Sequence, residues 1–157
     1  MIYLSQLKLI KTKGLPVSAQ WLYQIRIKVS SDLSRDLRSN NDSNALSKKI
    51  YDIAKTHQTT PVCTYDAFCG YCEEAERNGV EKYPLYSWTK ETIDNPEKVK
   101  KHITSFAFYT NESQVYEESL AKKLYEDLVP LRKKNLINDL KIIDSNPKNN
   151  PQPPKKS

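Results

Sequence analysis

The chain has 157 residues, enough for one domain with its own core, and its 38% hydrophobic and 28% charged residues are a globular composition. It has only three glycines and no glycine-rich phosphate-binding motif, so we exclude the common nucleotide-hydrolysing and dinucleotide-binding domains. The net charge of +6 would suit a polyanionic partner, but Lys148, Lys155 and Lys156 lie near the C-terminus, so a protein with a mildly basic surface and no such partner is the preferred interpretation.

The N-terminal segment and the cysteines bear on the cellular compartment. Gln6 and Lys8 interrupt the first apolar run, so we expect no secretory signal peptide there. No window is apolar enough to span a bilayer. Three cysteines is an odd number, which argues against a secreted disulfide framework. We therefore expect a cytoplasmic protein with reduced thiols, no membrane partner and no nucleotide cofactor.

Period-two alternation of apolar residues predicts the strands. The clearest strand covers residues 21–29, where we expect Ile25 and Ile27 to face the core and Gln24, Arg26 and Lys28 to face solvent. Further strands are predicted over residues 2–10, 62–68, 103–110 and 136–143.

Apolar residues at helical spacing predict two longer helices. The first covers residues 44–57, with Asp42 or Ser43 as its N-cap. The second follows Asn111 as N-cap and carries an apolar stripe over residues 115–131. A short helix is predicted to start over residues 73–77, and residues 80–101 show no single element because prolines interrupt them.

The order of these elements predicts an α+β fold. We expect a ferredoxin-like split βαβ antiparallel sheet with helices on one face and an extra N-terminal strand. The predicted domain covers residues 1–144, and residues 145–157 form a disordered tail rich in proline and lysine.

All three cysteines lie within ten residues, and the last two form the motif Cys69-Gly-Tyr-Cys72. At a strand-to-helix junction, helix amides stabilise the first thiolate and the second thiol resolves a mixed disulfide. The motif resembles that of thioredoxin-like disulfide oxidoreductases and isomerases, in which an aromatic residue such as Phe68 precedes the first cysteine. The resemblance implies that Cys69 attacks and Cys72 resolves. The proline that this family places before a later neighbouring strand has no counterpart here.

Zinc is a second option for the same segment. His57, Cys63, Cys69 and Cys72 supply four nitrogen and sulfur ligands, the number that a closed tetrahedral site needs. Only Cys69 and Cys72 have the spacing of a zinc knuckle, so we expect no metal as the default.

Nucleic-acid binding on a sheet face is the third option. Strand aromatics can stack on bases while nearby cations contact phosphates. The candidate aromatics are Trp21, Tyr23, Phe106 and Phe108, and the candidate cations are Arg26, Lys28, Lys100 and Lys101. Aromatic residues that alternate on strands more often pack in a core against helices, and no RNA-recognition signature is present.

The leading hypothesis is therefore a non-enzymatic binding protein. It acts either as a subunit of a larger assembly, through a protein partner, or on nucleic acid. The alternative is a thiol–disulfide oxidoreductase or redox sensor that uses Cys69 and Cys72.

Overall fold

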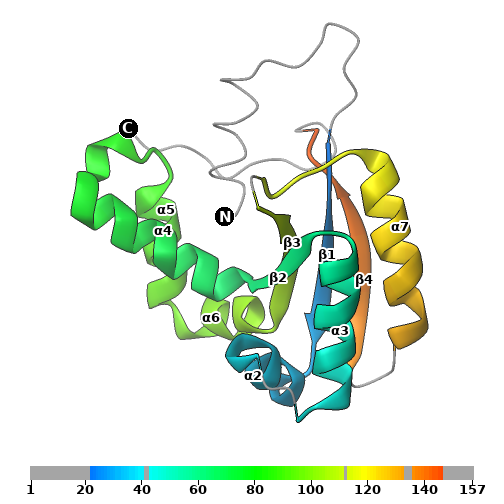
Figure 1. The fold of residues 1–157 in the computed structure, drawn as a ribbon. Coiled ribbons are helices and arrows are strands. Elements are labelled where there is room, and N and C mark those ends of the chain that lie inside the picture. The colour runs from blue at the N-terminus through cyan, green and yellow to red at the C-terminus, as the bar shows by residue number, and fades with distance from the viewer. Residues whose placement is uncertain (1–21, 41–42, 112, 133–135, 147–157) are drawn as a thin grey trace, which may run out of the picture.

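The computed structural model describes residues 22–40, 43–111, 113–132 and 136–146. The strand predicted over residues 2–10 and residues 147–157 of the predicted tail lie outside these ranges. The described elements are β1 (Tyr23–Val29), α2 (Ser31–Ser39), α3 (Ala45–Thr56), β2 (Thr59–Cys63), α4 (Thr64–Asn78), the 3-10 helix η1 (Val80–Lys82), α5 (Tyr86–Asp94), α6 (Pro96–Ile103), β3 (Ser105–Thr110), α7 (Glu118–Leu128), the 3-10 helix η2 (Val129–Leu131) and β4 (Ile137–Asp144) (Figure 1).

The four described strands form one antiparallel sheet in the order β2-β3-β1-β4. β1 lies inside the sheet and pairs with β4 from Tyr23 to Val29, with one irregularity after Lys28. Its pairing with β3 is shorter and covers only Arg26 to Lys28. The predicted α+β class is confirmed, with helices and an antiparallel sheet in one chain.

The first face of the sheet carries the main core. Its side chains alternate along β1 and β3 as the sequence predicts, and α3 and α7 pack against them (Figure 1). The fully buried members from these four elements are Ile25, Ile27, Val29, Phe106, Phe108, Ile50, Ala54, Ala121, Leu124 and Leu128. The other side of β1 is less exposed than predicted, because Gln24 retains only 1% exposure.

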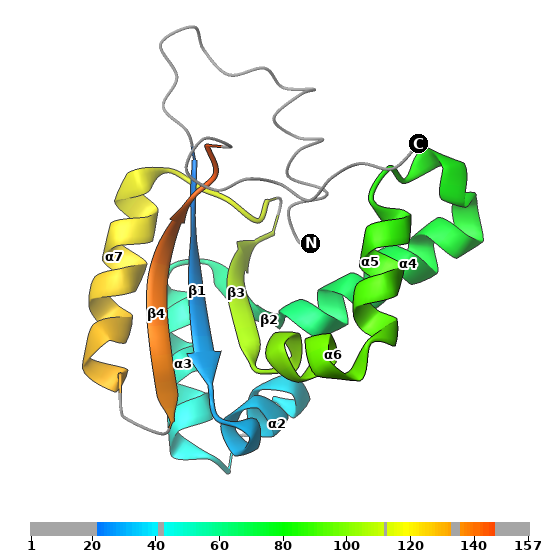
Figure 2. The same ribbon diagram turned by 180° about the vertical axis from the view of Figure 1, so that it is seen from behind.

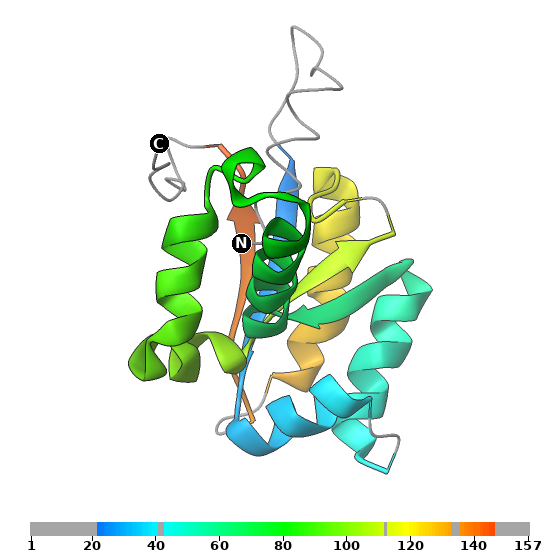
Figure 3. The ribbon, with the colours of Figure 1, turned by 90° about the vertical axis from the view of Figure 1, so that its left-hand side faces the viewer.

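The second face of the sheet is partly covered by α4, α5 and α6, which join β2 to β3. Phe68 of α4 packs on Ala107 of β3, and Trp88, Ile93 and Tyr109 surround this contact. Figure 3 shows the sheet standing between α5 and α6 on one side and α3 on the other. The expectation of helices on one face therefore holds for α3 and α7 but not for the α4–α6 segment. Ala107 permits the second layer because its small side chain lets the Phe68 ring approach the strand.

The predicted strand over residues 62–68 is wrong after Cys63, where β2 ends and α4 begins. Phe68, Cys72 and Ala75 are buried, and their separations of four and three residues mark one face of a helix. Cys63, Tyr65 and Ala67 alternate with the polar Thr64 and Asp66, and this pattern agrees with a strand only by coincidence. α4 also replaces the short helix predicted to start over residues 73–77.

The region over residues 80–101 consists mainly of two helices that the prolines start rather than interrupt. Pro96 occupies the first turn of α6, where a missing N–H costs nothing. The Asn95 side chain caps this helix by accepting from the backbone N–H of Glu97 at 3.0 Å.

Of the two long helices predicted from the sequence, the first is confirmed and the second starts later than predicted. The helix over residues 44–57 is confirmed as α3, and its N-cap is Asn44, which accepts from Ser47 N–H at 3.0 Å. Asn111 does not cap α7, which starts at Glu118 after Glu117. Before it, Tyr116 exchanges two backbone hydrogen bonds of 2.8 Å with Tyr23, so this stretch extends the sheet instead.

None of the helices that the structure describes is both long and apolar enough to cross a membrane.

Candidate nucleic-acid interface

Cations gather on the second face of the sheet, beside the α4–α6 segment. Arg26 of β1 lies opposite Lys141 of β4, and both point to this face because paired residues share a side. Lys28 lies two residues after Arg26 on β1, so its side chain points to the same face. Its Nζ donates to the backbone oxygen of Lys101 in α6, at 2.8 Å. We call Arg26, Lys28, Lys101 and Lys141 the basic face. No described helix lies in front of its β1 and β4 part (Figure 2).

Neighbouring cations disfavour the charge of Lys28, and burial disfavours the charge of Arg26. Burial, followed by the nearby Lys101 ammonium, lowers the pKa of Lys28, and Lys141 acts in the same direction. Burial lowers the pKa of the Arg26 guanidinium to about 10, so it stays charged at neutral pH at some cost in solvation. Asp139 offsets part of this charge through an ion pair of 3.2 Å with Lys141. An anion placed here would relieve the remaining repulsion.

The structure brings together three of the four cations predicted to bind nucleic acid. Arg26, Lys28 and Lys101 belong to the basic face, whereas Lys100 forms an exposed pair with Glu97 at 3.7 Å on α6. Lys141 was missed, because only the pairing of β4 with β1 places it beside Arg26.

The predicted base-stacking role of strand aromatics is wrong for Phe106 and Phe108. Their side chains are 1% and 0% exposed and lie in the core beneath α3 and α7. Tyr23 is half-buried against the same core, and Trp21 lies outside the described residues. Phe106 and Phe108 are therefore not available for stacking, and the described part of the second face carries cations instead.

His102 lies between the basic face and the α4 helix. Its ring is half-buried against Phe68, with ring centroids 5.1 Å apart. Burial, then the charges of Lys101 and Lys28, lowers the pKa of His102 from its ordinary value of 6.5 to about 4. The imidazole is therefore neutral in the folded protein at any pH well above 4.

This shift predicts acid destabilisation with a defined pH window. Above pH 6.5 the imidazole is neutral in both states, and between 6.5 and about 4 only the unfolded chain takes up the proton. We expect the free energy of unfolding to fall by about 1–2 kcal/mol across that window, after allowing for solvent screening of a half-buried ring. Urea titrations at several pH values would measure the loss.

The His102→Gln variant should lose this part of the pH dependence, and Lys101→Gln should reduce it by removing a repelling charge. An unchanged slope in His102→Gln would contradict the assignment.

The two cysteines of the Cys69-Gly-Tyr-Cys72 motif lie in the middle of α4 rather than at its N-terminus. Cys63 occupies the strand-to-helix junction instead, and its Sγ–H donates to the backbone oxygen of Ile103 at 3.4 Å. Burial, followed by the charge of Glu76, raises the pKa of the Cys72 thiol to about 11. Helix N-terminal amides therefore cannot stabilise a Cys69 thiolate in the way that the predicted junction requires.

The zinc option is wrong on geometry. His57, Cys63, Cys69 and Cys72 all belong to the described residues, and no three of them come together as a group able to hold a metal ion. His57 lies at the end of α3, where its Nε2 is 2.6 Å from an Asp127 carboxylate oxygen of α7. That contact gives His57 a structural role, because it links α3 to α7, the two helices that cover the first face.

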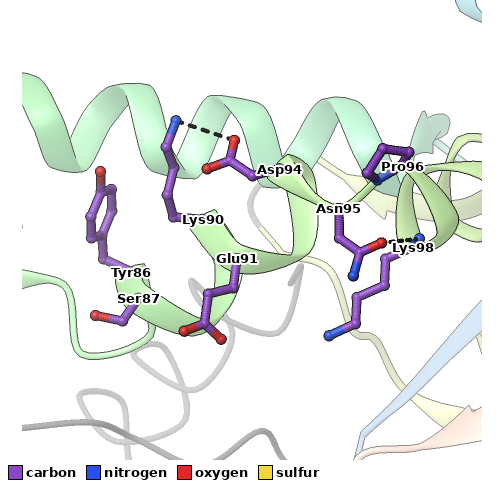
Figure 4. A pocket seen from close by; sticks show the side chains of 8 residues that line it. All are labelled: Tyr86, Ser87, Lys90, Glu91, Asp94, Asn95, Pro96 and Lys98. Atoms are coloured by element: carbon purple, nitrogen blue, oxygen red, sulfur yellow. Dashed lines mark hydrogen bonds and ion pairs between the residues drawn. The ribbon is translucent and has the colours of Figure 1, made fainter.

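A shallow depression of about 810 Å³ lies along α5 and the start of α6. Figure 4 shows its lining residues, among them Glu91 on one side and Asp94 turned toward Lys90, at 3.6 Å. The carboxylates make it a poor place for an anion. The Tyr86 hydroxyl at its edge donates to a Glu76 carboxylate oxygen at 2.6 Å, and this hydrogen bond raises the pKa of Tyr86 to about 12.

Comparisons with protein-family models, with curated proteins and with solved structures find no match to this chain, so the candidate interface is defined by its geometry and charge alone.

Proposed function

We propose that this chain is a non-enzymatic binding domain whose basic face holds the sugar–phosphate backbone of a nucleic acid. The observation that carries the proposal is the convergence of Arg26, Lys28, Lys101 and Lys141 from three separate elements onto one side of the sheet. Cations brought together at a cost in mutual repulsion are typical of a surface that meets repeated negative charge.

We further propose that the sheet is ferredoxin-like. In a split βαβ arrangement each parallel pair of strands leaves room for one strand between them. β1 and β2 are separated by β3, and β3 and β4 are separated by β1, while the crossover helices α3 and α7 pack on the same face. The α4–α6 segment is then an insertion between the second and third strands.

The character of the surface favours nucleic acid over a protein partner. Among the described residues, the large apolar side chains that are well exposed are Val80, Val129, Leu136 and Ile142. Each of these side chains is only 37–43% exposed, so the described residues offer a protein partner little apolar area.

The mode of binding follows from the side chains present. Lysine and arginine contact phosphates, which carry no sequence information, and the buried Phe106 and Phe108 cannot stack on bases. We therefore expect affinity that depends strongly on salt and weakly on base sequence.

Fluorescence anisotropy with a labelled single-stranded RNA of about 12 nucleotides tests this. Binding should weaken by at least tenfold between about 50 and about 200 mM NaCl. The Lys28→Gln and Lys101→Gln variants should each lower affinity several-fold and reduce the slope of log affinity against log salt by about one.

Lys122→Gln is the matched control. Lys122 lies on α7, on the opposite side of the sheet, where it pairs with Glu118 at 3.8 Å. An equal loss in Lys122→Gln, or no binding by the wild type at the lower salt concentration, would sink the proposal.

A further inference from the structure

The net positive charge of the chain lies in its two terminal segments. Residues 1–21 and 147–157 hold no acidic residue, and their lysines are Lys8, Lys11, Lys13, Lys148, Lys155 and Lys156. Since the whole chain has 25 basic and 19 acidic residues, residues 22–146 carry equal numbers of the two. A domain without net charge attracts a polyanion only through local concentrations of cations, so the terminal lysines decide the overall field.

Both terminal segments leave the described domain at one corner of the sheet. β1 begins and β4 ends there, since Tyr23 pairs with Asp144. Beyond this pair, the Ser145 N–H donates to the backbone oxygen of Leu22 at 3.0 Å. Figure 2 shows these two strand ends side by side. Lysines from the two ends of the sequence are therefore tethered to the same point of the domain.

This corner adjoins the exposed part of the basic face. Lys141 lies four residues before Ser145, about 13 Å along β4, and its side chain is 61% exposed. On the second face, the pair between Lys141 and the corner is Gln24 with Ile143, and neither side chain is charged. Asp144 alternates to the first face. Between Lys141 and the corner, a nucleic-acid strand therefore meets no negative charge from β1 or β4.

Acidic residues on the other half of the second face direct a strand toward the same corner. The run from α4 to α5, residues 64–94, has seven acidic and three basic side chains. α4 covers the sheet at Ala107 of β3, away from β4. Because this run repels a phosphate backbone, the favourable path crosses β1 and β4 instead. That path leads from Lys101 and Lys28 past Lys141 to the terminal segments.

We propose that one nucleic-acid strand contacts the basic face and the terminal lysines together, so that the binding site extends past the corner of the sheet. The inference deepens the proposed function and rests on it. Lys148 lies three residues from Ser145 and Lys13 lies nine from Leu22. A chain spans at most about 11 Å over three residues and about 32 Å over nine. Cations tethered this close act at a high effective concentration once a strand lies on the basic face.

Two variants of the full chain neutralise the lysines of one terminal segment each, K8Q/K11Q/K13Q and K148Q/K155Q/K156Q. Fluorescence anisotropy measures their binding to a labelled single-stranded RNA of about 18 nucleotides. Each variant should lose about threefold to tenfold in affinity at about 50 mM NaCl, because fewer counterions are released on binding. The slope of log affinity against log salt should fall by about one to two in each.

The matched control, K49Q/K55Q/K123Q, removes the same amount of charge from another part of the protein. These three lysines are exposed on α3 and α7, the helices that cover the first face. Because salt screens charges that lie far from the strand, the control should bind within about twofold of the wild type. An equal loss in the control would mean that net charge alone sets the affinity, and the shared site would be overturned.

RNA length tests whether the site extends past the corner. Unlabelled strands of about 4 and about 18 nucleotides compete with the labelled strand, and only the longer one covers the basic face and continues beyond it. The loss in the two terminal variants should be at least about threefold smaller for the short strand than for the long one. Equal losses for both lengths would contradict the extension.

The outcomes separate this inference from the proposed function. Wild-type affinity in both terminal variants, with a loss in Lys28→Gln, would overturn the extended site and leave the proposed function standing. Losses in the terminal variants with full binding by Lys28→Gln would overturn the basic face and the shared site together. Failure of the wild type to bind either strand at the lower salt concentration would also overturn both.

Discussion

Replacing Phe106 with alanine is expected to lower the free energy of unfolding by about 3–5 kcal/mol. Phe106 lies in β3, between Ile27 of β1 and Cys63 of β2, and is 1% exposed. Its loss leaves a cavity where the first face of the sheet meets α3 and α7. Because domains of this size are stable by only about 5–15 kcal/mol, the variant should unfold at a much lower urea concentration.

Two further variants serve as controls for Phe106→Ala. Phe106→Leu preserves most of the volume and should cost about 1.5 kcal/mol or less. Ile142→Ala alters a side chain that is 37% exposed on β4 and should cost less than about 1 kcal/mol. If Phe106→Ala were as stable as Ile142→Ala, Phe106 could not be in the core, and the base-stacking hypothesis would regain its main residue.

The sequence predicts β1 and β3 well because their signal is local. Ile25, Ile27 and Val29 alternate with polar residues, and this alone assigns one face to the core. Gln24 is the exception, since its burial depends on Gln114, 90 residues away. No pattern within β1 distinguishes a glutamine that faces water from one that serves a buried hydrogen bond.

The segment from Val62 to Ala75 shows why the sequence predicts a strand where α4 begins. Two patterns coexist there: alternation from Val62 to Phe68 and helical spacing through Phe68, Cys72 and Ala75. Both share Phe68, and α4 buries only one apolar residue per turn because it meets the sheet through a small contact with Ala107. The deciding information is the tertiary contact, which local periodicity does not carry.

Only part of the candidate site could be predicted from the sequence, for a related reason. Arg26 and Lys28 share a face of β1 by simple alternation, so a cation pair could be predicted. Lys101 joins them through the contact of α6 with β1, and Lys141 through the register of β4 on β1. Long-range pairing turns two neighbouring cations into a face built from three elements.

The Tyr116 hydroxyl joins β1 to β3 where direct pairing stops. It accepts from the backbone N–H of Ile25 at 2.9 Å and donates to the backbone oxygen of Phe108 at 2.8 Å. Ile25 and Phe108 are the next pair in register after Arg26 and Ala107, so the hydroxyl bridges a ladder position that the strands have left open. Tyr116 itself is 6% exposed, and water has little access to replace it.

Tyr116→Phe is therefore expected to cost about 2–4 kcal/mol, because one buried N–H and one buried C=O each lose a partner. Tyr51→Phe provides the comparison, since its half-buried hydroxyl makes one hydrogen bond, to the backbone oxygen of Leu37 at 2.6 Å, and should cost about 1 kcal/mol. Equal losses in the two variants would mean that the Tyr116 bridge is not what joins the strands.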